Sequence, residues 1–246
     1  MLRLNTFSIA ARCKRTGMFG VAVSTAVPGV GSLCPFAKAG IGAVATQSWV
    51  NPYLGIDGLR LMTQGLRAPA ALERLLAEDP GRNVRQVGLV DRNGESAAWS
   101  GPDCVPWFGH IIGPDFAAQG NMLVGEETVR AMAAAFQRAE ALDLPERLLV
   151  ALEGGQAAGG DKRGKQSAAM LVVNTEEYPY CELRVDEHRY PVGELRRVYE
   201  VARHQLLPFV RGLPTRQNPL GGIGQDVQAL LLTPPPYRPG GGGSTP

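Results

Sequence analysis

The chain has 246 residues, of which 44 % are apolar and 20 % are charged, and its formal net charge is +2. These values are typical of a globular protein of one or two domains, and they give no reason to expect nucleic acid or a membrane surface as a partner. No segment approaches the roughly 18 continuous apolar residues of a membrane span, and the N-terminus lacks the apolar region of a secretory signal, so we expect a cytoplasmic protein. The four cysteines and three histidines have no spacing typical of metal ligands, so we expect no metal ion and no other cofactor.

The first half of the chain predicts strands followed by two helices. Residues 6–12 and 18–24 are short apolar runs joined by a turn that ends in glycine, which indicates a β-hairpin. Residues 40–49 (GIGAVATQSW) are apolar on both faces, as expected of a fully buried strand. The apolar spacing then becomes helical in two segments, residues 56–64 and 69–78.

The second half repeats this order of strands and helices. RQVGLVDRNGESAAWSG contains two alternating runs around Asn93-Gly94 and predicts another hairpin. Three further apolar segments predict strands, at residues 116–123, 166–173 and 181–188. Helices are predicted at residues 126–138, 145–152 and 191–210.

The order of these elements favours a layered α+β fold. Adjacent hairpins are typical of antiparallel sheets, and helices that arrive in pairs are typical of covering layers. A sandwich of two sheets flanked by helices is one of several arrangements that fit. We expect a single domain, residues 1–211, because residues 212–246 are rich in proline and glycine and predict a disordered tail.

Three local motifs resemble known sites but lack the required context. GIGAVA matches the dinucleotide fingerprint, yet it lies inside a predicted strand instead of opening a helix. GGDKRGKQ nearly matches the phosphate-binding loop, but it ends in Gln166, which has no hydroxyl for magnesium. Cys34 has no histidine or asparagine partner nearby in sequence, and we interpret it as a buried thiol.

Six segments together resemble a known family: TFSIAAR, GVAVSTAVPGVGS, GAVATQSWVNPYLG, DPGRNVRQVGLVD, GHIIGPDFAAQGNML and GGDKRGKQSAAMLVV. In this order they resemble the bacterial family of unknown function numbered 1028, which is grouped with the N-terminal-nucleophile (Ntn) hydrolases. The resemblance extends over about residues 6–185. It implies a four-layer αββα sandwich of two mainly antiparallel sheets and a homodimer, without naming a substrate.

The resemblance directs attention to Thr6. The wider superfamily consists mostly of amidases and peptidases in which the hydroxyl or thiol of the first residue attacks an amide carbonyl and that residue's free α-amine accepts the proton. Five residues, MLRLN, precede Thr6 in this sequence, and Leu2 is too bulky for removal of the methionine alone. The catalytic role therefore requires removal of residues 1–5. The alternative is that Thr6 is an ordinary strand residue.

Further residues are candidates for the same site. Related Ntn folds place a basic residue near the nucleophile at the position of Lys38, where its charge would keep the amine neutral. The amide of Asn121, at a strand end, is a candidate oxyanion donor. The alternatives are a solvated loop lysine and a turn cap. The candidates for substrate binding are Gln47, Asn51 and four residues of the polar segment GGDKRGKQS, namely Asp161, Arg163, Gln166 and Ser167.

Each binding candidate also has a structural alternative. Asn51 stands before Pro52, where asparagine commonly forms a turn. The alternative for GGDKRGKQS is a charged surface turn, although the resemblance favours the binding role.

The sequence therefore supports two functions. The first is an Ntn-type amidohydrolase that cleaves an amide bond in a small cytoplasmic substrate with Thr6 as nucleophile. The second is a non-catalytic Ntn-like module with an unprocessed N-terminus that binds a small molecule or mediates assembly.

Overall fold

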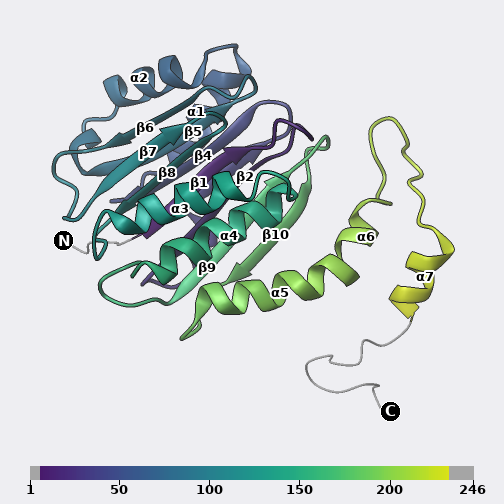
Figure 1. Cartoon of the computed structure of the whole chain (residues 1–246). Helices are drawn as coiled ribbons and strands as arrows, with labels where there is room; N and C mark the ends of the chain where they lie inside the picture. Colours follow the sequence, from purple (N-terminus) through teal and green to yellow (C-terminus); the bar gives the residue numbers. More distant parts are fainter. Residues whose placement is uncertain (1–5, 233–246) are drawn as a thin grey trace. The chain divides into compact units, whose positions relative to one another are not determined.

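The computed structural model describes residues 6–232 and divides the chain into two compact units, residues 1–197 and 198–246. The first unit contains two antiparallel β-sheets with two helices on the outer face of each (Figure 1). The predicted α+β sandwich is thus confirmed, and its layers follow the order αββα.

The larger sheet has six strands in the order β10-β9-β2-β1-β8-β7, and every neighbouring pair is antiparallel. The strand that begins at Thr6 is the third from one edge, so it has a hydrogen-bonded neighbour on both sides. The strands of this sheet are β1 (Thr6–Arg12), β2 (Phe19–Thr25), β7 (Gly109–Gly113), β8 (Phe116–Asn121), β9 (Ser167–Val173) and β10 (Pro179–Val185).

The smaller sheet has four strands in the order β3-β4-β5-β6, also antiparallel throughout. Its central strands β4 and β5 pack against β1, β2 and β8 of the larger sheet. The strands are β3 (Pro35–Lys38), β4 (Gly42–Ser48), β5 (Arg85–Asp91) and β6 (Ser96–Ser100).

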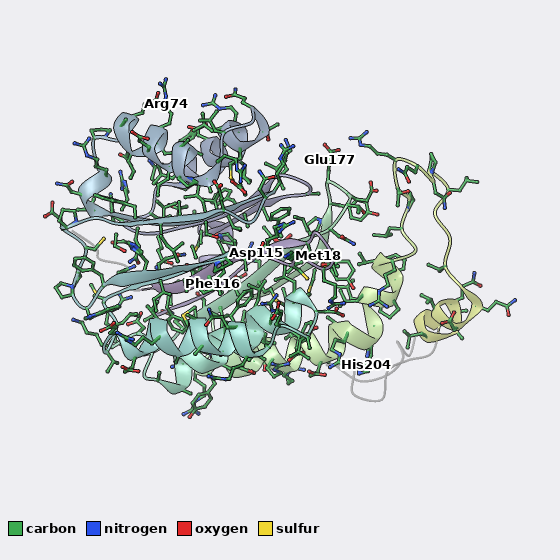
Figure 2. The ribbon with its side chains drawn as sticks, turned by 45° about the horizontal axis from the view of Figure 1, so that its top comes forward. Met18, Arg74, Asp115, Phe116, Glu177 and His204 are labelled. Carbon is green, nitrogen blue, oxygen red and sulfur yellow. The ribbon has the colours of Figure 1, made fainter. Side chains whose placement is uncertain are left out.

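Each sheet is covered on its outer face by a helix pair. The pair α1 and α2 packs against the four-stranded sheet, and α3 and α4 pack against the six-stranded sheet (Figure 1). Apolar side chains fill the space between the layers (Figure 2). The helices are α1 (Pro52–Thr63), α2 (Ala68–Glu78), α3 (Glu127–Arg138) and α4 (Leu144–Ala157).

Two strands of the structure were not predicted from the sequence. β3 has only four residues, and β7 lies in a segment rich in glycine and proline that suggested a loop. β7 nevertheless pairs with β8 because the two-residue turn Pro114-Asp115 joins them, with Asp115 in the left-handed region at φ 64°. Each of these short strands pairs with a longer neighbour, and its own sequence is too short to show a clear alternation of apolar and polar residues.

The second unit contains the remaining helical segments. The helix predicted at residues 191–210 is formed by α5 (Pro191–Gln205), which begins in the first unit, and α6 (Leu207–Val210). Within the predicted tail the structure places α7 (Gln225–Leu232), and residues 233–246 lie outside the described residues. None of the helices between residues 6 and 232 combines the length and the apolar run needed to cross a membrane.

Candidate functional site

Thr6 begins β1 and lies between two polar neighbours in the sheet. It is in register with Thr25 of β2 on one side and with Asn121 of β8 on the other. Its hydroxyl donates to the hydroxyl of Thr25 over 3.2 Å. Thr6 is only 3 % exposed. Because two ladders fix its backbone and a neighbouring hydroxyl fixes its side chain, Thr6 occupies a defined position at the start of the strand.

Gln47 reaches across from the smaller sheet and holds the backbone of Thr6. Its Nε2 donates to the Thr6 carbonyl over 3.1 Å and to Oε1 of Gln86 over 2.7 Å. Its Oε1 accepts a hydrogen bond of 2.6 Å from the hydroxyl of Ser8. With both amide hydrogens and its oxygen engaged, and with 2 % exposure, Gln47 connects the two sheets.

Gln86 is the centre of this buried network. Its Oε1 accepts from Nδ2 of Asn121 over 3.0 Å as well as from Gln47. Its Nε2 donates to the Gly120 carbonyl over 2.8 Å and to the hydroxyl of Ser100 over 2.7 Å. The Asn121 amide, a candidate oxyanion donor, is therefore directed into the core toward Gln86, and Asn121 is 1 % exposed.

The loop around Asp161 is joined to the strands that flank Thr6. Asp161 forms an isolated β-bridge with Leu123, two residues beyond Asn121. Its carboxylate accepts hydrogen bonds from the backbone N–H of Ala26 over 3.1 Å and of Arg163 over 2.8 Å. The Arg163 guanidinium completes an ion pair of 3.2 Å with the same carboxylate, which is 1 % exposed. This loop thus lies at the end of the sheet where Thr6 begins.

Gln166 and Ser167 lie beside the same strand end. Ser167 is in register with Thr25, and its hydroxyl donates to the Val27 carbonyl over 2.6 Å. The backbone N–H of Gln166 donates to the Thr25 carbonyl over 2.8 Å. Ser167 is fully buried, so its hydroxyl holds the segment after β2 in place.

Lys38 and Asn51 have local partners in the structure. Lys38 is in register with Gly42, which lies at the opposite end of β4 from Gln47. The Nζ of Lys38 lies 3.4 Å from the hydroxyl of Thr63. Five residues of strand correspond to about 16 Å. Asn51 is the N-cap of α1, as its side-chain oxygen accepts from the N–H of Tyr53 over 3.1 Å. The structure does not bring Lys38 to Thr6, and it gives Asn51 a capping contact.

The sulfur of Cys34 is unsuited to nucleophilic attack. Cys34 is 2 % exposed, and burial raises the pKa of its thiol to about 12. At neutral pH the group is therefore the protonated thiol, whereas the nucleophile in cysteine catalysis is the thiolate.

Sequence reasoning missed four polar residues of this region, which are Ser8, Thr25, Gln86 and Gln119. Gln119 donates to the hydroxyl of Ser8 over 2.7 Å and so extends the network along β8. The available signal was a glutamine inside an otherwise apolar strand, a position where an amide needs a buried partner.

A family model and several solved structures are similar to this chain. A family model described as "Family of unknown function (DUF1028)" matches residues 6–195. The crystal structure of the DUF1028 protein SPO2555 from Silicibacter pomeroyi is 30 % identical, with a TM-score of 0.81, and the match covers 89 % of this chain and 100 % of that chain. Anbu (ancestral beta-subunit) from Yersinia bercovieri is 12 % identical, with a TM-score of 0.37 over 85 % of this chain and 98 % of that one. No curated protein matches the sequence.

Proposed function

The chain belongs to the DUF1028 family of unknown function, and we propose that it is an Ntn-type amidohydrolase whose nucleophile is Thr6 after removal of residues 1–5. The observation that carries the proposal is the position of Thr6. It is the first residue of an interior strand in a two-sheet sandwich, with its carbonyl held by Gln47 and its hydroxyl bonded to Thr25. Because its backbone and side chain are held by these contacts, Thr6 is positioned for reaction before a substrate binds.

The proposed reaction begins with attack of the Thr6 hydroxyl on a substrate amide carbon. The free α-amine of Thr6 takes the hydroxyl proton, and the new C–O bond gives a tetrahedral oxyanion. Collapse of the oxyanion breaks the C–N bond, and the leaving amine takes the proton from the α-ammonium. Water then hydrolyses the Thr6 ester, which releases the acid and restores the hydroxyl. The substrate class is accordingly a small molecule with an acyl–amine bond.

Of the two basic candidates, Arg163 and not Lys38 lies at this end of the sheet. Its guanidinium pairs with Asp161, and the same carboxylate holds the N–H of Ala26, directly after the Thr25 that bonds to Thr6. Because Asp161 pairs with this guanidinium, the pair is close to neutral, and its role in the proposal is to fix the segment that follows Thr25. In the proposal the Arg163 side chain, which is 33 % exposed, contacts an anionic end of the substrate, whereas the Asp161 carboxylate is 1 % exposed and positions Arg163.

The test is to produce the chain with methionine directly before Thr6, so that removal of one methionine exposes the threonine. The matched control carries Thr6→Ala, which is also small enough to follow a removable methionine. Intact mass verifies the N-terminus of both proteins. A β-lactone, which acylates a hydroxyl without a leaving group, should add its full mass to the peptide that begins at Thr6 and leave the alanine form unmodified.

Hydrolysis is followed with the same pair of proteins. N-acyl amino acids and short peptides are supplied, and the release of primary amine is measured. We expect release by the Thr6 form alone, at similar melting temperatures for both proteins. Equal release by the Thr6→Ala form, or no β-lactone adduct on an exposed Thr6, would refute the proposal.

One observation favours the alternative, a non-catalytic binding module. Thr6 is 3 % exposed in the unprocessed chain, so a substrate has little access to its hydroxyl. In this alternative the purified protein retains residues 1–5 and holds a small molecule without altering it. Dialysis against a metabolite mixture, followed by mass analysis, would then recover an unchanged compound with the protein.

A further inference from the structure

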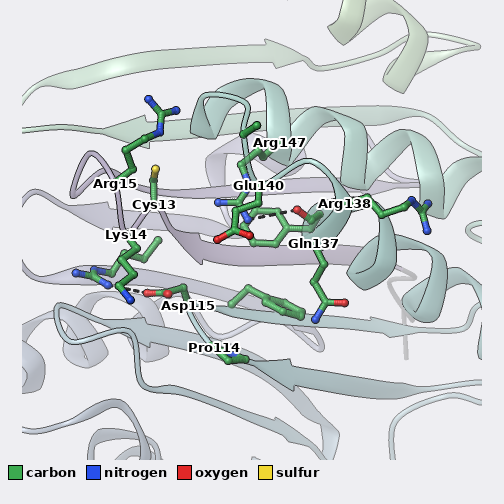
Figure 3. A pocket seen from close by; sticks show the side chains of 13 residues that line it. Cys13, Lys14, Arg15, Pro114, Asp115, Gln137, Arg138, Glu140 and Arg147 are labelled. Carbon is green, nitrogen blue, oxygen red and sulfur yellow. Dashed lines mark hydrogen bonds and ion pairs between the residues drawn. The ribbon is translucent and has the colours of Figure 1, made fainter.

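A second polar cleft lies at the far end of β1 from Thr6. Its volume is about 910 Å³, and its walls are the turn after β1, the turn between β7 and β8, and the connection from α3 to α4 (Figure 3). Thr6 and Arg12 are the first and last of the seven residues of β1, so the cleft and the proposed nucleophile lie at opposite ends of this strand. A cleft of this size accommodates a small organic molecule.

Basic side chains predominate in the lining of this cleft. Five of the lining residues are basic and two are acidic, namely Arg12, Lys14, Arg15, Arg138 and Arg147 against Asp115 and Glu140. Arg12 is neutralised by Asp115 at 2.7 Å, and Arg15 pairs outside the lining with Asp143 at 2.9 Å. The cleft therefore retains an excess of positive charge, which attracts anions.

Arg147 is the buried member of this group. It is 8 % exposed, its Nη2 donates to the Phe136 carbonyl over 3.3 Å, and its guanidinium lies 4.0 Å from the centre of the Phe136 ring. Its Nε is buried and has no hydrogen-bond partner among residues 6–232. No carboxylate of the described chain forms an ion pair with Arg147.

A buried guanidinium without a carboxylate partner is costly unless another group compensates its charge. Burial lowers the pKa of Arg147, although Cys13 of the same cleft and the charges of Glu140 and Asp115 act to raise it. Figure 3 shows Glu140 and Arg147 at the same wall of the cleft. An anion bound in the cleft would supply the missing charge, and a guanidinium forms paired hydrogen bonds with oxyanions in particular.

We propose that this cleft binds a small oxyanion, a phosphate or carboxylate group of a metabolite, with Arg147 at its base and Lys14 and Arg138 at its rim. Lys14 and Arg138 are exposed, so they are available to a ligand that enters from solvent. Phe116 and Phe136 form a largely buried apolar wall of the same cleft. The site is independent of the chemistry at Thr6.

The test is titration of the full chain with inorganic phosphate and, separately, with citrate, by calorimetry at constant ionic strength. Arg147→Met removes the buried charge, and Lys14→Met removes a rim charge on an exposed turn, where the fold is not at risk. The control is Arg74→Met, which removes one charge from α2, on the far side of the other sheet (Figure 2).

We expect saturable binding of at least one of the two anions to the unmodified chain. Arg147→Met should weaken this binding by about tenfold or more, Lys14→Met should weaken it less, and Arg74→Met should leave it unchanged. Stronger binding of phosphate or of citrate identifies which oxyanion the cleft prefers. Absence of saturable binding to both anions, or equal loss of affinity in all three variants, would overturn the proposal. If Arg147→Met does not fold, an unchanged affinity of Lys14→Met for the anion would also overturn the proposal.

Discussion

Replacement of Gln86 by leucine tests the buried network that connects the two sheets. Gln86 is fully buried, and its side chain has partners on both of its polar atoms. Leucine has a similar volume but no polar atom, so the change removes the hydrogen bonds and leaves the packing largely unaltered. The Nδ2 of Asn121, which donates to Gln86 over 3.0 Å, then has no other partner among the hydrogen bonds of the described residues.

The magnitude follows from the groups left behind. Gln47 keeps its bond to the Thr6 carbonyl, and Ser100 keeps its contact of 3.0 Å with Nδ1 of His110. The groups left without a partner are therefore the Asn121 amide and one amide hydrogen of Gln47, and a buried donor without a partner costs about 1–3 kcal/mol. With the net value of the other lost bonds, and some gain from the apolar side chain, we expect Gln86→Leu to lower the free energy of unfolding by about 2–3 kcal/mol.

Urea denaturation of Gln86→Leu, Asn121→Leu and the double variant measures this effect. Because the double variant removes both partners, its loss should be smaller than the sum of the single losses by about 1 kcal/mol or more. The exposed change Gln137→Leu on α3 is the control, with an expected effect within about 0.5 kcal/mol. A loss below about 1 kcal/mol for Gln86→Leu, or strict additivity in the double variant, would refute the reasoning.

Two further changes test other parts of the frame. A Cβ at Gly88 would lie 2.1 Å from Oε1 of the fully buried Gln119, so Gly88→Ala should lower the free energy of unfolding by about 1–3 kcal/mol. At Gly58 a Cβ would have no neighbour nearer than 3.4 Å, so Gly58→Ala should not destabilise the fold. Thermal melts of the two variants measure the difference. Burial raises the pKa of the Asp79 carboxyl, but hydrogen bonds from Arg85 at 2.9 Å and from a backbone N–H outweigh it, so the pKa lies below its ordinary 3.8. A group with a lowered pKa stabilises the fold above its unfolded pKa, and that contribution is lost as the pH falls through the folded pKa. Asp79→Asn should therefore reduce stability at pH 7 and flatten its decline below about pH 4; an unchanged acid profile would contradict this assignment.

The sequence predicted the frame where apolar periodicity was strong. The hairpin of β5 and β6 could be read from RQVGLVD and the Asn93-Gly94 turn, because alternation and turn chemistry agree there. β3 and β7 gave no such signal, since each is short and depends on pairing with a longer neighbour. Pairing of that kind is a tertiary contact, and local propensity does not contain it.

The candidate site was predictable in part, for a related physical reason. Asn121 lies next to Thr6 because antiparallel register pairs these two strand ends, whereas Gln47 reaches Thr6 from the other sheet through the packing of the two sheets. Lys38 was misplaced relative to Thr6 because β3 runs away from that strand end, a direction that no sequence pattern indicates. The contribution of Gln86 depends on which sheet faces which, and only the packed structure reveals it.

The arrangement around Thr6 bears on whether removal of residues 1–5 could yield a working nucleophile. Its carbonyl is held by Gln47, its hydroxyl by Thr25, and its strand by ladders on both sides. All of these contacts come from residues after position 5. Cleavage before Thr6 would therefore create a free amine on a residue whose carbonyl and side chain are already fixed. Gln47 is itself fixed by Gln86 and Ser8. Substitutions in this amide network should therefore change the rate of the proposed amide hydrolysis at Thr6 before they unfold the chain. The network thus links stability to the proposed chemistry.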